Sequence, residues 1–270
     1  MINLKGKTAL VTGISDNVGF GFHIAKTLAQ AGADIIVSCH PRLESIVERF
    51  LEKEKYAESR KFSNNNGEFK AKYIVPCDAG LDSSIKNLFE KLSQNNEKID
   101  ILVHSLAFSP EIDKKHIDVS REGYLTAVSI SAYSLISLCK NLLPLMANRQ
   151  ASVMALSYLA AERAVPFYGG GMASAKAALE SDVRMLSWSL GELGHRINTI
   201  SPGPYASRAA KSIGDIDEMI ARVEKKSPLK RAITAQDVAN TALFLASDLS
   251  LAITGEIIHV DAGFHAMALA

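Results

Sequence analysis

Cysteine is scarce in this chain, and the few cysteines present share no pattern. Cys39, Cys77 and Cys139 are the only three among 270 residues. An odd number without regular spacing does not form a disulfide framework, and zinc sites need clustered cysteine and histidine ligands. We therefore predict reduced, buried thiols, no bound metal and a cytoplasmic location.

A surplus of one charge and a long apolar run are also missing. The 30 Lys and Arg residues against 29 Asp and Glu give a formal net charge of +1, so charge indicates neither nucleic acid nor an anionic membrane as a partner. No uninterrupted apolar run reaches the roughly 18 residues of a membrane-spanning helix. The first residues, "MINLKGKTALVTG", have no signal-peptide pattern. We expect a protein that engages neither nucleic acid nor membrane.

The chain does contain a regular alternation of short apolar runs and amphipathic segments. The runs that predict strands are 8–13, 33–39, 71–78, 99–107, 151–160, 196–204 and 255–263. Between them, helical spacing predicts helices at 83–94, at 134–146 and from about Met172 onward. Apolar strands alternating with helices are typical of a parallel sheet covered on both faces. Since no segment has the composition of a linker, we predict one Rossmann-type doubly wound α/β domain over residues 1–270, with a seven-stranded parallel sheet.

Residues 42–70 interrupt this alternation. They carry a charged run, "RLESIVERFLEKEKYAESRK", followed by a polar stretch, "FSNNNG". A long crossover helix with a solvated face and a loop is the simpler interpretation, and a docking surface is the alternative.

Three glycines stand between the first strand and the first helix. The stretch "TGISDNVGFG" carries Gly13, Gly19 and Gly21. Glycine lets the backbone approach a pyrophosphate, and the amides and dipole of the following helix favour its negative charge. The spacing is not the G-x-G-x-x-G fingerprint, and such a turn can also be merely tight. At the start of an α/β chain, the pattern favours dinucleotide binding.

The ends of the second and third strands bear on the choice of cofactor. A carboxylate after the second strand would select NAD through the adenosine ribose, and a basic residue would accept the extra phosphate of NADP. This chain has "SCHPR" there, with His40 and Arg42 and no carboxylate. Asp78, after the third strand, could meet the adenine amino group or cap a turn. The choice between the two cofactors stays open.

A lysine and two tyrosines are the candidate catalytic groups. The stretch "YGGGMASAK" runs from Tyr168 to Lys176, and Tyr158 lies upstream. Ordinary short-chain dehydrogenases place tyrosine four residues before lysine, where this chain has Met172, which has no proton to donate. The glycines let the chain fold back so that Tyr168 can reach the cleft. Lys176 would then lower the pKa of a nearby phenol, which could hydrogen-bond an oxyanion. Taken singly, each residue is more simply a core tyrosine or a surface lysine.

Five longer stretches favour a catalytic role for these residues, because they resemble a known family. They are "TGISDNVGFGFHIAK", "VHSLAFSP", "SYLAAERAVPFYGGGMASAKAALESDVR", "INTISPGPYASRAAKSIG" and "ITGEIIHVDAGF". Together they span nearly the whole chain and resemble the NAD(P)H-dependent enoyl-acyl-carrier-protein reductases, a divergent branch of the short-chain dehydrogenase superfamily. The three glycines after Tyr168 and the eight-residue step to Lys176 resemble the plant and chlamydial type.

The resemblance implies a role for each matched position. Tyr158 and Tyr168 match the two active-site tyrosines, and Lys176 matches the lysine that binds the nicotinamide ribose. Ser109 matches a substrate-contacting position, and residues 205–214 match a mobile loop that closes over the acyl chain. The positions implied to contact the dinucleotide are Gly13, Gly19, Phe20, His40, Asp78, Ala79, Leu106, Lys176, Tyr205, Ala206, Ser207, Arg208 and Ala209.

The implied reaction is reduction of the trans-2 double bond of a fatty acyl thioester on acyl carrier protein, with hydride from NADH and NADPH as a possible substitute. Tyr168 would hydrogen-bond the thioester oxygen while Lys176 acts through the cofactor ribose. The family also implies a homotetramer. One alternative is a carbonyl reductase or alcohol dehydrogenase, against which Met172 argues. Another is a non-catalytic dinucleotide sensor, which has no reason to keep both tyrosines and Lys176.

Overall fold

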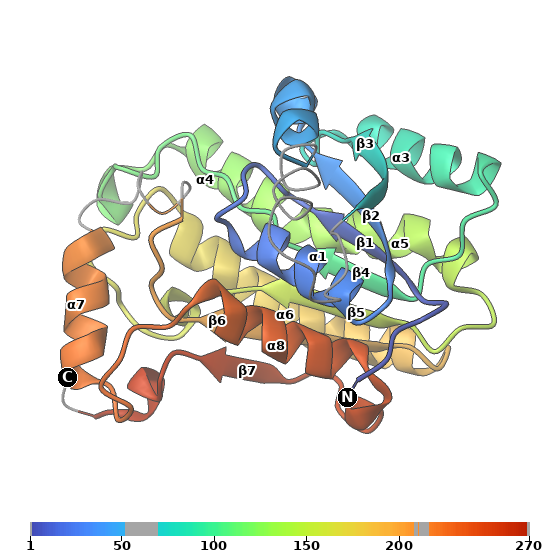
Figure 1. The fold of residues 1–270 in the computed structure, drawn as a ribbon. Helices are drawn as coiled ribbons and strands as arrows, with labels where there is room; N and C mark the ends of the chain where they lie inside the picture. Colours follow the sequence, from blue (N-terminus) through green and yellow to red (C-terminus); the bar gives the residue numbers. More distant parts are fainter. Residues whose placement is uncertain (1, 52–69, 208–209, 211–215, 269–270) are drawn as a thin grey trace.

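Seven parallel strands form the centre of the computed structural model, which describes residues 2–51, 70–207, 210 and 216–268. In chain order the strands are β1 (Thr8–Thr12), β2 (Asp34–Cys39), β3 (Ala71–Pro76), β4 (Ile101–His104), β5 (Ser152–Leu156), β6 (Arg196–Pro202) and β7 (Ile257–Val260). Across the sheet their order is β3-β2-β1-β4-β5-β6-β7, and every neighbouring pair is parallel (Figure 1). The predicted doubly wound fold and its seven strands are confirmed.

Helices connect the strands, as the alternating pattern predicts. The main ones are α1 (Phe20–Gln30), α3 (Asp82–Gln94), α4 (Arg121–Val128), α5 (Ser134–Met146), α6 (Met172–Gly191), α7 (Ile216–Lys226) and α8 (Ala235–Ala246). A π-helical segment, η3 (Ser129–Tyr133), joins α4 to α5. Short 3-10 turns are η1 (Pro41–Leu43), η2 (His116–Asp118), η4 (Leu159–Ala161), η6 (Asp248–Ser250) and η7 (Phe264–Ala266).

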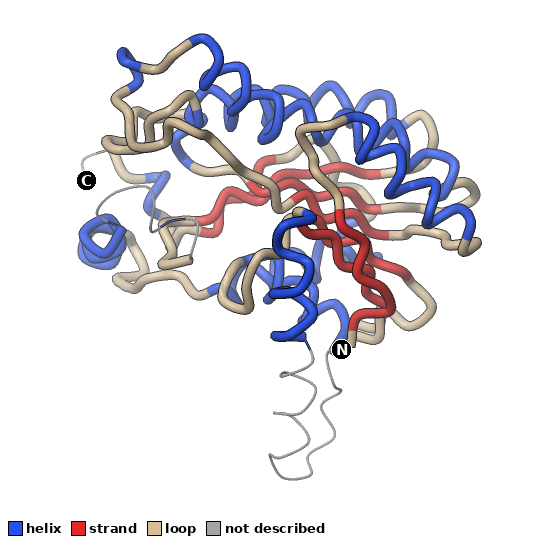
Figure 2. The backbone as a smooth tube through the Cα atoms, turned by 90° about the horizontal axis from the view of Figure 1, so that it is seen from above, coloured by secondary structure: helices blue, strands red, loops and turns tan. Residues whose placement is uncertain are grey.

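The helices bury apolar residues on both faces of the sheet (Figure 2). On one face, Leu28 of α1 and Leu245 of α8 belong to a buried cluster with β1 and β2 residues. On the other face, α3, α5 and α6 share a second cluster that includes Leu138 and Leu179. Strands buried on two faces must be apolar at successive positions. This explains why they can be predicted from uninterrupted apolar runs in the sequence.

Two predicted segments fall largely outside the described residues. Within the charged segment 42–70, residues 44–51 are helical, and Val47 and Leu51 are buried in the first cluster. Its remaining part, 52–69, is not described, nor are 208–209 and 211–215 of the loop at 205–214. The three cysteines are buried and unpaired, as predicted.

One finding corrects the sequence analysis on membrane-length helices. The continuous helical stretch Arg121–Met146 is 26 residues long with a mean hydropathy of 1.3, enough by length and composition alone to cross a membrane. Reasoning from uninterrupted apolar runs misses it because serines and tyrosines are interspersed among its apolar residues. Half of its most apolar window is buried inside the protein, and a core helix passes the same test. Length and hydropathy therefore give little support to a membrane span here.

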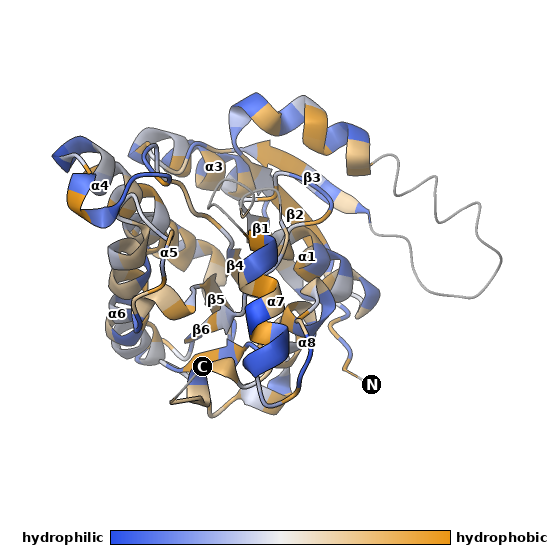
Figure 3. Ribbon diagram, turned by 90° about the vertical axis from the view of Figure 1, so that its left-hand side faces the viewer, coloured by the Kyte–Doolittle hydropathy of each residue, from blue (hydrophilic) through white to orange (hydrophobic). Residues whose placement is uncertain are grey.

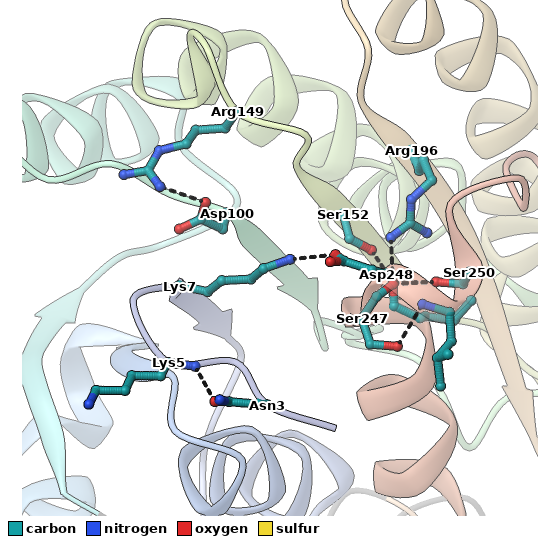
Figure 4. Close-up of polar contacts among 12 residues, drawn as sticks. Asn3, Lys5, Lys7, Asp100, Arg149, Ser152, Arg196, Ser247, Asp248 and Ser250 are labelled. Carbon is teal, nitrogen blue, oxygen red and sulfur yellow. Dashed lines mark hydrogen bonds and ion pairs between the residues drawn. The ribbon is translucent and has the colours of Figure 1, made fainter. Parts of the chain in front are cut away.

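The amino edge of the sheet is closed by polar contacts (Figure 4). Arg149 donates to Asp100 at 3.2 Å, and Asp100 in turn accepts the backbone amide of Thr8 at 2.9 Å. The buried Arg196 donates from Nη2 to the carbonyl of Leu245, at the end of α8, at 2.9 Å. These contacts tie loops to strands at this edge, so the ligand site is to be sought at the opposite edge.

The carboxyl edge contains the point where the strand order reverses. β1 pairs with β2 on one side and β4 on the other. Gly13, directly after β1, has φ +80°, and a Cβ atom there would lie 2.1 Å from the carbonyl oxygen of Ser105, after β4. Glycine is therefore required both by the backbone conformation and by the close approach of the two loops.

Gly13→Ala should lower the free energy of unfolding by more than about 1 kcal/mol, because alanine is strained at positive φ and its methyl group would overlap the Ser105 carbonyl. Gly6→Ala is the matched control, since Gly6 has φ +82° but nothing within 4 Å of its Cβ position. Urea unfolding of both variants separates backbone strain from close approach. Equal losses would contradict the role given to the approach of Ser105.

Candidate active site

A cleft of about 730 Å³ lies at the carboxyl edge of the sheet. Its lining comes from segments that follow β1 to β6 and from α7, which stands in front of the sheet in Figure 3. Doubly wound sheets bind ligands at this edge, beside the point where the strand order reverses. The volume falls in the range of about 300–1,000 Å³ that is usual for small-molecule sites.

The glycine-rich turn forms one end of the cleft. Asp16 accepts backbone hydrogen bonds from Val18 at 3.0 Å and Gly19 at 2.7 Å, which fixes the turn. Gly19 is the N-cap residue of α1 and has no side chain that could cap the helix. Gly13, Gly19 and Phe20 all line the cleft. A helix N-terminus with free amides favours a phosphate group.

His40 and Asp78 meet beside this turn. His40 Nε2 lies 3.6 Å from Asp78 Oδ2, and His40 Nδ1 accepts the amide of Arg42 at 3.2 Å. All three residues line the cleft. The sequence analysis left Asp78 between an adenine contact and a turn cap. It accepts the amide of Gly80 at 2.9 Å, so one carboxylate oxygen does cap the turn while the other faces His40.

Two tyrosines and a lysine form the other end of the cleft. The ring centroids of Tyr158 and Tyr168 are 4.8 Å apart, with their planes tilted by 50°. Lys176 is 4% exposed, and its Nζ donates to the carbonyl of Leu156 at 2.8 Å. A surface lysine is thereby excluded, and the three side chains line one cavity.

Burial dominates the protonation of these groups. It raises the pKa of Tyr158 to about 12 and raises that of Tyr168 further, with Tyr158 adding to the effect. It lowers the pKa of Lys176 to about 8, a shift that the nearby Glu180 opposes. The sequence analysis expected Lys176 to lower the pKa of a phenol; instead, desolvation raises the pKa of both tyrosines. Both phenols stay protonated at neutral pH and can donate a hydrogen bond.

The glycines after Tyr168 are required by packing. A Cβ atom on Gly169 would lie 1.9 Å from the carbonyl oxygen of Lys114, and one on Gly170 would lie 2.4 Å from that of Glu111. Gly170 and Gly171 have φ +57° and +79°, and Gly171 is the N-cap of α6. The tight fold-back that the sequence predicts is confirmed. It sets Tyr168 and the first turns of α6 on the same cavity.

Most of the predicted site residues come together in this cleft. Those that line it are Gly13, Gly19, Phe20, His40, Asp78, Ala79, Leu106, Tyr158, Tyr168, Lys176, Tyr205 and Ser207. Ala206 is exposed and outside the lining, and Arg208 and Ala209 lie outside the described residues. Ser109 is also outside it: its hydroxyl donates to the carbonyl of Gly170 at 2.7 Å, so it supports the tyrosine segment. A substrate contact by Ser109 stays a prediction.

Several lining residues escape sequence reasoning. Asp16 has a local signal, since an aspartate before "NVG" is typical of a side chain that caps its own turn. Ile130 has none, because it reaches the cleft from the π-helical segment η3. Ser131, in the same segment, accepts the amide of Phe108 at 3.0 Å and so holds the loop after β4. Such π-helical turns are frequent at functional sites.

Comparison with known proteins agrees with this geometry. A family model described as enoyl-(acyl carrier protein) reductase matches residues 13–265. This chain belongs to that family. It is 44% identical to chloroplastic enoyl-[acyl-carrier-protein] reductase [NADH] 2 of Oryza sativa subsp. japonica, over 100% of this chain and 78% of the relative. It is 41% identical to the NADH-dependent family member of Aquifex aeolicus, over 98% and 94% of the two chains.

Solved structures of enoyl-acyl-carrier-protein reductases share the fold. The Plasmodium berghei reductase with triclosan superposes with a TM-score of 0.91 at 38% identity, covering 97% of this chain and 99% of that one. The Bacillus cereus reductase with NADP+ and an indole naphthyridinone gives 0.89 at 34% identity and covers 100% of both chains. The resemblance read from the sequence motifs is thus confirmed at the level of the family.

The buried lysine should make stability depend on pH in a defined window. Unfolded chains keep Lys176 protonated up to its ordinary pKa of 10.5, whereas the folded chain loses this proton near pH 8. Between these values the unfolded state binds more protons, so stability rises with pH. From pH 7 to about 9.5, wild type should gain about 2 kcal/mol relative to Lys176→Met. Urea unfolding of wild type and Lys176→Met across this pH range measures the difference, with Lys140→Met as a control at an exposed lysine. If the free energies of unfolding of wild type and Lys176→Met changed in parallel with pH, the prediction would be wrong.

Proposed function

We propose that this chain reduces the trans-2 double bond of enoyl thioesters carried by acyl carrier protein, using NADH. Family membership over residues 13–265 supports the reaction class. The observation that carries the proposal for this chain is the cavity shared by Tyr158, Tyr168 and the buried Lys176, across from a phosphate-binding turn.

The residues present fit a dinucleotide. Gly13, directly after β1, lines the cleft, and its lack of a side chain lets this turn lie against the Ser105 carbonyl. The amides at the start of α1 would hold the pyrophosphate, and His40 with Asp78 would contact the adenosine half. Leu106 and Lys176 would hold the nicotinamide half. When bound, NADH supplies the hydride for the β-carbon of the substrate.

The side chains of this site can stabilise the charge that develops on the thioester oxygen. The Tyr168 phenol stays protonated because burial raises its pKa, so it can donate a hydrogen bond to that oxygen. Lys176 is fixed by the Leu156 carbonyl and presents its remaining N–H groups to the cavity. Tyr158 packs against Tyr168 and limits where its ring can lie. We assign Tyr158 a supporting role.

Met172 separates this proposal from a carbonyl reductase. It stands at the position four residues before Lys176, is 3% exposed and makes its polar contact with Ser131, through sulfur, at 3.6 Å. A buried thioether cannot donate a proton to an alkoxide. Reduction of ketones is therefore not expected from this arrangement.

The cofactor is NADH in the curated relatives, and NADH is the proposal here. No carboxylate follows β2 to repel an adenosine phosphate, and Arg42 lines the cleft. The Bacillus cereus structure holds NADP+. We therefore expect NADPH to be accepted as a weaker alternative.

Tyr168→Phe should lower kcat by about 100-fold or more, because one oxyanion donor is lost while the ring's packing is kept. NADH oxidation with a crotonyl or longer trans-2-enoyl thioester measures this, with NADPH and a ketone assayed in parallel. Tyr158→Phe is the matched control and should lose less. Unchanged turnover in Tyr168→Phe would move the donor to Tyr158, and cofactor binding without turnover by wild type would favour a dinucleotide sensor.

We further propose a homotetramer, as in the family that the sequence resembles. Large apolar side chains are exposed on neighbouring helices, with Leu125 of α4, Met185 of α6 and Trp188 of α6 at 57%, 69% and 73%. A second copy of this chain is the occupant we assign to this face. The expected cytoplasmic location stays a prediction, since the rice relative is named as chloroplastic.

Trp188→Glu should split the assembly, because a charge would have to be buried at the contact between copies. Light scattering after size-exclusion chromatography should give a smaller mass than for wild type. Leu81→Glu, at another exposed leucine near α3, should keep the wild-type mass. A wild-type mass for Trp188→Glu would exclude this face as the contact.

A further inference from the structure

The end of β5 clamps two buried polar groups of α6. Leu156 accepts a hydrogen bond from Lys176 Nζ through its carbonyl, at 2.8 Å. The next residue, Ser157, donates its hydroxyl hydrogen to Glu180 Oε1. Lys176 and Glu180 are one helical turn apart, so consecutive residues of β5 and its exit bind consecutive turns of α6. The residue after these two contacts is Tyr158.

Glu180 is an unusual residue to find at this position. It is 4% exposed, and burial raises the pKa of its carboxyl, an effect that the hydrogen bond from Ser157 opposes. Burying a carboxylate costs stability unless it is paired, and an apolar residue would pack between α6 and the sheet without that cost. Packing alone therefore does not explain a glutamate here.

The charges around this pair are few and can be named. Glu180 experiences Glu162, which raises its pKa, and Arg184 and Lys176, which lower it. Lys176 has Glu180 on its own helix and His104 on β4, whose pKa is lowered to about 3 by burial and by Lys176 itself. His104 is thus neutral near pH 7. The phenols of Tyr158 and Tyr168 are protonated as well. Among the described residues, Glu180 is the carboxylate whose charge raises the pKa of Lys176.

We propose that Glu180 is a positioning residue for the reductase: through Ser157 it fixes the backbone that carries Tyr158, and through its charge it keeps Lys176 protonated when the cofactor binds. The inference rests on the proposed function, since it concerns the same site. One side chain can have both effects because Leu156 and Ser157, at the end of β5, bind Lys176 and Glu180 of the same helix, α6. Tyr158 follows them directly in the chain. Glu180 itself does not line the cleft.

Glu180→Gln is the test, because glutamine keeps an oxygen that can accept from Ser157 but removes the charge. The pKa of Lys176 should fall, so the alkaline loss of kcat/KM should begin about one pH unit lower than in wild type. The dissociation constant of NADH, measured without substrate by cofactor fluorescence, should be about fivefold higher than that of wild type near pH 8 and should approach about tenfold at higher pH. Glu192→Gln, the same change at the exposed end of α6, should leave both profiles at wild type.

Ser157→Ala tests the positional half. It keeps the carboxylate but removes the link to the segment before Tyr158, so kcat should fall about tenfold. The melting temperature should also fall, because the buried carboxylate loses a hydrogen bond, so kcat is measured well below the melting transition. In the double variant, Glu180→Gln with Ser157→Ala, the loss in kcat should be smaller than the product of the single losses, because the two residues act as one unit.

Wild-type pH profiles for both turnover and NADH binding in Glu180→Gln would overturn the inference and leave Glu180 a structural residue. A wild-type kcat in Ser157→Ala would overturn its positional half, and that variant decides the matter if Glu180→Gln does not fold. Failure of the proposed function would look different. Wild type would then bind NADH without turnover, while the shift in the pH dependence of NADH binding would still support or contradict the coupling between Glu180 and Lys176.

Discussion

The burial of one ammonium group is the constraint on which the site depends. Lys176 is held at 4% exposure by a carbonyl from the end of β5, in a cavity where two phenols are also desolvated. In such surroundings an ionic or hydrogen-bonding interaction is far stronger than in water. The same desolvation brings the lysine pKa to about 8, so the group is charged at neutral pH by a small margin. Any group that changes the pKa of Lys176 therefore changes how much of this lysine is charged at neutral pH.

Close backbone approach places Tyr168 in the same cleft as this lysine. Tyr168 cannot share a helical face with Lys176 in the ordinary four-residue arrangement, because α6 begins only at Met172. Instead, glycines carry the chain past the carbonyl oxygens of Glu111 and Lys114 at distances that no side chain would permit. Ser109 holds the same segment through Gly170. The position of the tyrosine is thus fixed by the loop after β4 as much as by its own helix.

The fold was largely predictable, whereas the site was predictable only in part. Strands such as β1 are buried at all five positions, and continuous burial leaves an uninterrupted apolar run that can be read directly. Asp16 and the glycines also have local signals. The expectation that Tyr168 and Lys176 share one site needed the resemblance to a family, because each residue alone has an ordinary structural explanation; both do line the cleft. The contact between Ser157 and Glu180 joins residues 23 apart, and the reach of Ile130 depends on a π-helical turn. Neither leaves a periodic trace in the sequence.

The polar residues at the two edges of the sheet differ in their exposure to water. At the amino edge, two ion pairs, Arg149 with Asp100 and Lys7 with Asp248, are partly open to water, so each adds little stability. At the carboxyl edge, Lys176, Glu180 and the tyrosines are desolvated and destabilise the fold unless partners are supplied. The two apolar clusters on the faces of the sheet provide the rigidity that keeps those partners in place. The buried Lys176 and Glu180, both held by the end of β5, therefore fit the positioning role that we propose better than a contribution to stability.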